Sequence, residues 1–233
     1  FENQGKVWET TGTANAWARG DFGAAKEVDF VGLLSTNATA TTTARLRLGD
    51  TQAEVDGTAD YDSAAQLIRS PAIDHWSGLY HWYWELPSLQ TKRWWRIDIG
   101  SHTGDFRGMA LVLGKRFQFA EFYNHTSGVS FGQEDTGSIE FGRFGVNAKE
   151  GGIKMRTLGM EFGWMNANDR RKFQQIRDRL GNTGMAYYCF DGEPTVDRQE
   201  NQYFGWQRKP IVIQPTTFAQ DRFGMQVDII SII

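Results

Sequence analysis

Several short segments of this chain alternate strictly between apolar and polar side chains, and this alternation constrains the fold more than any other feature. In ARLRLGD the apolar residues alternate with Arg45 and Arg47. In RWWRIDIG, Trp95, Ile97 and Ile99 occupy every second position. Side chains two apart lie on the same face of a β-strand. Each segment therefore predicts a strand with one buried and one solvated face.

The first part of the chain, residues 1–126, is predicted to form an antiparallel β-sandwich. The apolar runs VDFVGLL and MALVLG supply further strands, and STNATATTT predicts a turn between VDFVGLL and ARLRLGD. Clusters of Gly, Asn, Asp and Thr separate the other strands. Many short strands with turn residues between them are typical of sandwiches.

The second part, residues 127–233, is predicted to be a separate β-rich domain. Glycines divide it into short segments, and IEFGRFGV, IKMRTLGMEFGWM and GMAYYCFD are predicted strands of a second sheet. The terminal segment MQVDIISII is so apolar that we expect it to be buried in a sheet or covered by another subunit.

One α-helix, at about residues 168–180, is predicted to pack on this second sheet. A single stripe of the helix carries Phe173, Ile176 and Leu180. Apolar residues at this spacing share one face of a helix. Asn168 or Asp169 can cap the first turn, and Gly181 supplies the stop at the end.

Composition argues against several classes of function. The formal net charge of -3 provides no basic field, so nucleic acid is not an expected partner. No segment reaches the length of about 20 apolar residues that a membrane-spanning helix needs. The single cysteine, Cys189, excludes a disulfide or a cysteine-based metal cage within one chain.

Motifs for catalysis are absent from the sequence. The four histidines are dispersed, and neither GxSxG nor a phosphate-binding loop occurs. The acidic pairs Asp60/Asp62 and Glu134/Asp135 could in principle serve glycoside hydrolysis, but adjacent acids in a polar turn are usually solvated. We therefore expect a protein that is not an enzyme and that uses no cofactor and no metal.

The aromatic segment YHWYWE and the tryptophan just before it form the remaining candidate site. Its candidate carbohydrate-binding residues are Trp76, Tyr80, Trp82 and Trp84. Alternation places aromatic rings on both faces of this strand, whereas a sugar-stacking platform needs only one. The pattern favours a role in the core for one face and a loop cover or a neighbouring subunit for the other, with the sugar platform as the alternative.

The order of these segments resembles the discoidin-like (galactose-binding-like) sandwich of minor tail and tail-tip proteins of tailed bacteriophages. The first half matches through VDFVGLLSTNATATTTARLRLGD, KRWWRIDI and GMALVLGKRF, and the second through GMEFGWM, the helix, MAYYCFD, YFGWQRKPIVI and FGMQVDIISI. In the family a hairpin precedes a WRI-type strand, which leads to a strand that ends in glycine, a basic residue and an apolar residue. The corresponding positions are Arg96, Ile97, Gly114, Lys115, Arg116 and Phe117.

The resemblance implies a structural role in the virion tail. The implied partners are other tail proteins, such as tail-tube, hub or tail-tip components, together with further copies of this chain in an oligomer or ring. Contact with a bacterial surface glycan would contribute to host attachment. The alternative function is a carbohydrate-binding module that recognises a cell-surface polysaccharide.

Overall fold

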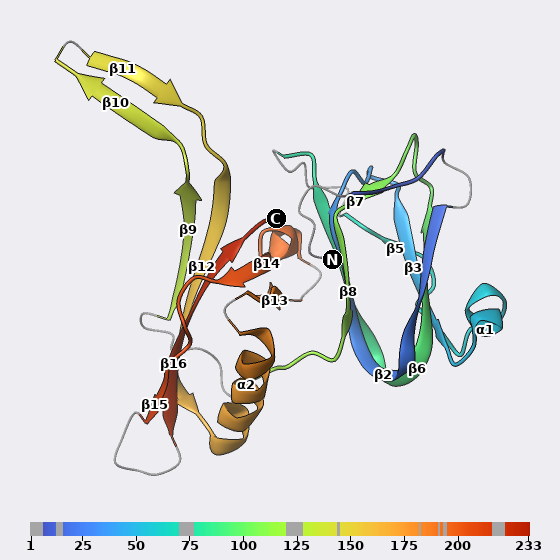
Figure 1. Ribbon diagram of the computed structural model, residues 1–233. Helices are drawn as coiled ribbons and strands as arrows, with labels where there is room; N and C mark the ends of the chain where they lie inside the picture. The colour runs from blue at the N-terminus through green and yellow to red at the C-terminus, as the bar shows by residue number, and fades with distance from the viewer. Residues whose placement is uncertain are drawn as a thin grey trace. The chain divides into compact units, whose positions relative to one another are not determined.

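Antiparallel β-sheets make up most of the protein, as the alternating patterns predicted. The computed structural model describes residues 7–12, 16–69, 77–119, 128–143, 145–181, 183–190, 192, 195–215 and 222–233 (Figure 1). The chain forms two compact units. Unit 1 consists of Phe1–Phe117 and Asp191–Asn201, and unit 2 consists of Gln118–Phe190 and Gln202–Ile233. The predicted domain boundary, between residues 126 and 127, lies outside the described residues.

Unit 1 is built around two very long strands. Its elements are β1 (Trp8–Glu9), β2 (Ala16–Thr36), β3 (Thr43–Gly49), α1 (Gln52–Asp56), β4 (Tyr61–Asp62), β5 (Gln66–Leu67), β6 (Tyr80–Gly100), β7 (Arg107–Gly108), β8 (Ala110–Gly114) and the 3-10 turn η1 (Val196–Gln199). The main sheet has the order β4-β3-β6-β2-β8. VDFVGLL and ARLRLGD are both strands, but they do not form the hairpin that the resemblance implied, because β6 lies between them and pairs with both.

The two long strands bend together, and the bend gives the sheet two layers. Pairing of β2 with β6 shifts register at three places, which start at Asp21, Val28 and Leu33. Such irregularities bend a strand and increase its twist. β8 pairs with the second half of β2, whereas β3 pairs with the second half of β6 (Figure 1). Side chains from both halves therefore meet in one core.

The predicted apolar faces fill that core. Leu46 and Leu48 from β3 pack in one cluster with Ile97 and Ile99 from β6, while Arg45 lies on the other face. Burial of apolar area of this kind is the main force that holds such a sandwich together. The period-two interpretation of both segments is confirmed.

A segment from the second half of the chain belongs to unit 1. We call Asp191–Asn201 the strap. The buried Gln199 accepts a hydrogen bond from the backbone N–H of His81 at 2.7 Å and donates one to the backbone carbonyl of His81 at 2.6 Å. The amide side chain thus satisfies both backbone groups of one buried residue of β6, as a neighbouring strand would.

Unit 2 contains a second antiparallel sheet and a separate ribbon. Its elements are β9 (Val129–Asp135), β10 (Ser138–Gly142), β11 (Gly145–Glu150), β12 (Lys154–Met165), α2 (Ala167–Leu180), β13 (Ala186–Cys189), β14 (Gln202–Gln207), β15 (Ile213–Pro215) and β16 (Phe223–Ser231). The sheet has the order β13-β14-β16-β12-β9, and β15 also pairs with β16. The terminal apolar segment is therefore an inner strand, with Met225, Val227 and Ile229 buried, as predicted.

Helix α2 packs on this sheet near its predicted position. The rings of Phe173 and Phe119 lie 5.6 Å apart, and Phe119 lies 4.2 Å from the ring of Phe162 in β12. The cap is Asn166, not Asn168 or Asp169, because the chain is still extended at Asn166 and its side chain accepts hydrogen bonds from the next free backbone N–H groups. Gly181, with a φ of 57°, ends the helix as predicted.

Candidate functional site

The aromatic strand β6 supplies core residues instead of an open stacking surface. Tyr80 and Trp82 are only 4% and 1% exposed, and both belong to the core cluster of unit 1. Trp84 is half-buried against the same cluster, and its indole N–H donates to the hydroxyl of Tyr61 at 3.2 Å. Trp76 lies outside the described residues. The burial of Tyr80 and Trp82 removes these two rings from a sugar-binding surface, because one face of β6 is needed to fill the sandwich.

The opposite face of the same strand is also covered. His81 and Tyr83 are buried, and the backbone N–H of Ser35 donates to the Nδ1 atom of His81 at 2.9 Å. A Cβ atom on Gly192, in the strap, would lie 3.0 Å from the ring of Tyr83. Together with the Gln199 contacts, this proximity shows that the strap covers part of this face. The sequence pattern predicted either such a loop or a neighbouring subunit here.

Three of the four acidic residues considered for glycoside hydrolysis are held in ion pairs, and the fourth, Asp135, accepts a hydrogen bond from the backbone N–H of Gly137 at 2.8 Å. Asp60 contacts the ammonium of Lys92, which also lies 2.8 Å from Asp50. Asp62 accepts a hydrogen bond from Nε of Arg45 at 2.7 Å. Carboxylates of Asp50, Asp60 and the neighbouring Glu54 approach within 4.8 Å of one another, so the positive charge of Lys92 offsets their repulsion. In the second sheet, Glu134 pairs with Arg208 at 3.2 Å.

The outer face of the unit 1 sheet carries a network of arginine and aspartate. Arg19, Arg96 and Arg47 lie side by side on β2, β6 and β3. Arg96 contacts Asp98 at 2.7 Å and Asp56, at the end of α1, at 2.9 Å. These like charges would repel one another across the strands if the intervening carboxylates did not separate them. The network therefore stabilises the sheet and attaches α1 to it.

Asp62→Asn is expected to make the free energy of unfolding of the protein depend less steeply on pH in the acid range. The hydrogen bond from Arg45 lowers the pKa of the Asp62 carboxyl below its ordinary value. A carboxyl with a lowered pKa stabilises the fold above the pKa of the unfolded chain, about 4, and loses this contribution as the pH falls through the folded-state value. Urea denaturation from neutral pH to about pH 2 should show a steeper loss in the wild type than in the variant. At neutral pH the variant should lose no more than about 1 kcal/mol, because both partners are partly exposed.

A matched substitution on the other side of the pair tests this assignment. Arg45→Met removes the same ion pair, so it should flatten the pH profile as Asp62→Asn does, and the double variant should add little. A profile of Asp62→Asn that runs parallel to the wild type would contradict the role of the pair.

A two-stranded ribbon, which we call the arm, extends from one end of the unit 2 sheet. The arm consists of β10 and β11, which continue from β9 and into β12 (Figure 1). Gly137 and Gly152 stand at its base, where a Cβ on Gly152 would overlap the backbone of Gly137. Near this base Ile139 is 51% exposed and Ile153 is 71% exposed. The sequence predicted strands here but placed them in the second sheet, whereas, among the described residues, β10 and β11 pair with each other alone.

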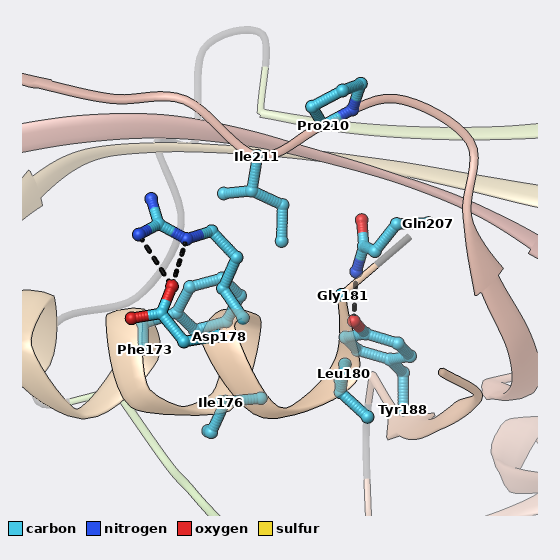
Figure 2. A pocket seen from close by; sticks show the side chains of 10 residues that line it. Phe173, Ile176, Asp178, Leu180, Gly181, Tyr188, Gln207, Pro210 and Ile211 are labelled. Atoms are coloured by element: carbon cyan, nitrogen blue, oxygen red, sulfur yellow. Dashed lines mark hydrogen bonds and ion pairs between the residues drawn. The ribbon is translucent and has the colours of Figure 1, made fainter. Parts of the chain in front are cut away.

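A cavity of about 350 Å³ lies in unit 2 between the second half of α2 and the strands β13 and β14 (Figure 2). Its lining residues are Phe173, Ile176, Arg177, Asp178, Leu180, Gly181, Tyr188, Gln207, Pro210 and Ile211. The side-chain Nε2 of Gln207 donates to the hydroxyl of Tyr188. Burial raises the pKa of Tyr188 to about 12. The helical stripe identified three of the apolar residues, but no motif indicated that Tyr188 and Gln207 would meet beside them.

Comparison with protein-family models and with curated proteins found no match to this chain. Among the described residues, no helix is both long and apolar enough to cross a membrane.

Proposed function

We propose that the protein is a structural component of the tail tip of a tailed bacteriophage. In this role it assembles with tail-tube, hub or other tail-tip proteins and with further copies of itself, and it contributes to attachment at the host surface. The order of strands and helix that carries the family resemblance supports the proposal. The two-layered antiparallel sheet of unit 1 is compatible with the discoidin-like sandwich that this resemblance implies.

The observation that carries the proposal is the arm. A two-stranded ribbon is only marginally stable in water, because most of its side chains have no second layer to pack against. The exposed Ile139 and Ile153 lose contact with water only when another surface covers them. A partner that covers these residues would stabilise the arm, and an assembly of tail proteins supplies one.

Ile139→Lys is expected to reduce incorporation of the chain into phage particles at least tenfold while leaving the fold intact. The substitution places a charge on an apolar surface that assembly would bury, and a cost of about 1.4 kcal/mol already corresponds to a factor of ten. Quantitative mass spectrometry of purified particles measures incorporation, and circular dichroism of the free chain measures folding.

Leu89→Lys provides a matched control, because Leu89 is similarly exposed but lies on β6 in unit 1. This control should be incorporated at the wild-type level. Particles that contain no wild-type chain, or that accept Ile139→Lys and the wild type equally, would contradict the proposed role of the arm in assembly.

Tyr80 and Trp82 do not support the carbohydrate-binding alternative. With Tyr80 and Trp82 in the core, these two residues cannot provide the stacking surface of a carbohydrate-binding module. Any contact with a host glycan would have to use other residues of the chain.

A further inference from the structure

The outer side of α2 carries two arginines without an acidic partner. Arg171 and Arg179 are exposed, and among the described residues neither forms an ion pair. Residues four apart are neighbours on a helix, and the exposed Gln175 occupies the position between them where an acid would offset their charges. The exposed Asp178 of the same helix is already paired with Arg177 at 2.8 Å. We call the row Arg171, Gln175 and Arg179 the basic ridge.

One face of the arm carries two carboxylates without a basic partner. Glu140 is the register partner of Ala148, and Glu150 is that of Ser138, so neither faces a cation across the ribbon. Residues two apart along a strand share a face, and this register therefore places both glutamates on the same side of the arm. Both are exposed, and in the part of the chain that the structure describes neither forms an ion pair. We call this pair the acidic face. Ile139 lies on the opposite face of the ribbon.

The basic ridge and the acidic face match in sign and in extent. Exposed charges of unit 1 find partners on neighbouring strands, as in the contacts of Arg107 with Glu9 at 2.7 Å and of Lys115 with Glu27 at 2.9 Å. The two ends of the basic ridge lie about 12 Å apart along the helix. Glutamates that are diagonal neighbours in a ribbon lie about 7–8 Å apart, a difference that long arginine side chains can span.

The two surfaces do not meet within one chain. Figure 1 shows the arm projecting beyond the end of the unit 2 sheet, whereas α2 lies along the sheet. No ion pair joins them among the described residues. A second copy of the chain, however, carries both surfaces, so the arm of one copy can reach the helix of another.

We propose that the acidic face of the arm packs on the basic ridge of α2 in a neighbouring copy of the chain. This inference rests on the role in assembly proposed above for the arm, and it names the arm's partner. The contact joins two different surfaces, so it is head-to-tail and repeats into a ring or an open row of copies. Ile139 remains available on the other face for a different tail protein.

Sedimentation velocity of the full chain at low and high salt tests the contact. The wild type should form oligomers at low ionic strength and dissociate as salt screens the exposed charges. The helix variant, Arg171→Glu with Arg179→Glu, should associate more weakly by a factor of about ten or more, because like charges then face each other. The arm variant, Glu140→Arg with Glu150→Arg, should show the same loss. Lys26→Glu reverses an exposed charge of unit 1 and should associate as the wild type does.

An equimolar mixture of the helix variant and the arm variant shows whether the contact joins different chains. In the mixture, each arm meets a helix of opposite charge on the other variant, so association should return toward the wild-type level. Circular dichroism verifies that both variants are folded.

The inference is overturned if the wild type stays monomeric, if its association does not respond to salt, or if folded variants associate as the wild type does. A mixture that associates no better than its components also overturns it. If the charge variants associate normally while Ile139→Lys is excluded from particles, the contact with α2 is refuted and the tail-tip proposal stands.

Discussion

Trp82→Ala is expected to lower the free energy of unfolding of unit 1 by about 3–5 kcal/mol. The side chain is almost completely buried and packs among residues from both layers of the sandwich. Its removal eliminates these apolar contacts and leaves a cavity, because the bent strands β2 and β6 can move only partly into the vacated space. Urea denaturation followed by circular dichroism measures the effect, and hydrogen exchange in β2 and β6 assigns it to unit 1.

A second tryptophan in the same unit serves as the control. Trp17 is 42% exposed and lies against the guanidinium of Arg96 at 4.6 Å. Trp17→Ala should therefore cost about 1 kcal/mol, the contribution of a surface cation–π contact. If Trp82→Ala instead keeps the wild-type stability and impairs only binding of a glycan, the aromatic strand is a recognition surface and its assignment to the core is wrong.

Gln199→Ala is expected to destabilise unit 1 by about 2–4 kcal/mol, because it removes two hydrogen bonds from the backbone of the buried residue His81. The side chain of Gln199 bonds to the backbone N–H and carbonyl of His81 at 2.7 Å and 2.6 Å. The alanine is too short to reach them. We expect the strap to lose protection from hydrogen exchange together with the part of β6 that contains His81.

Gln199→Glu separates the two hydrogen bonds. Its carboxylate can still accept from the N–H of His81, but it faces the carbonyl oxygen with a second acceptor and buries a charge. This variant should therefore be no more stable than Gln199→Ala at neutral pH. Gln90→Ala, which removes a partly exposed glutamine of β6, is the control and should change stability by less than about 0.5 kcal/mol. If the amide hydrogen exchange of the strap is the same in Gln199→Ala as in the wild type, Gln199 does not attach the strap to unit 1.

The strands could be predicted from the sequence because their pattern is local. The alternation of apolar and polar residues around Leu46 and Ile97 indicates which face of each strand is buried. The apolar side chains of those faces pack in the core of the sandwich. The apolar terminal segment likewise indicated a strand with a buried face, and Met225, Val227 and Ile229 of β16 form that face. Helix α2 was predictable from its stripe and from Gly181 at its end.

The features that the sequence did not reveal depend on distant contacts or on very short elements. The strap contacts unit 1 through two hydrogen bonds between Gln199 and His81, which are 118 residues apart in the sequence. The five-residue helix α1 is too short to show a periodic stripe, although Thr51 and Glu54 form a capping box that could have indicated its start. The cap at Asn166 lies two residues before Asn168 and three before Asp169, the two expected caps, because the first helical turn is polar.

The candidate sites were predicted only in part for similar reasons. Aromatic side chains on both faces of β6 indicated burial, and the structure shows which elements cover each face. The cavity combines α2 with residues of β13 and β14, and no local motif connects Ile176 with Gln207. The arm was predicted as strand, but nothing in its residues distinguished a free ribbon from strands of the main sheet.

Localisation of the chain in intact phage particles tests the central proposal most directly. Particles labelled with gold-conjugated antibody against the full chain should carry the gold at the distal end of the tail in electron micrographs. Tails without label at this end, in particles whose other tail proteins are labelled by their own antibodies, would contradict a structural role in the tail tip.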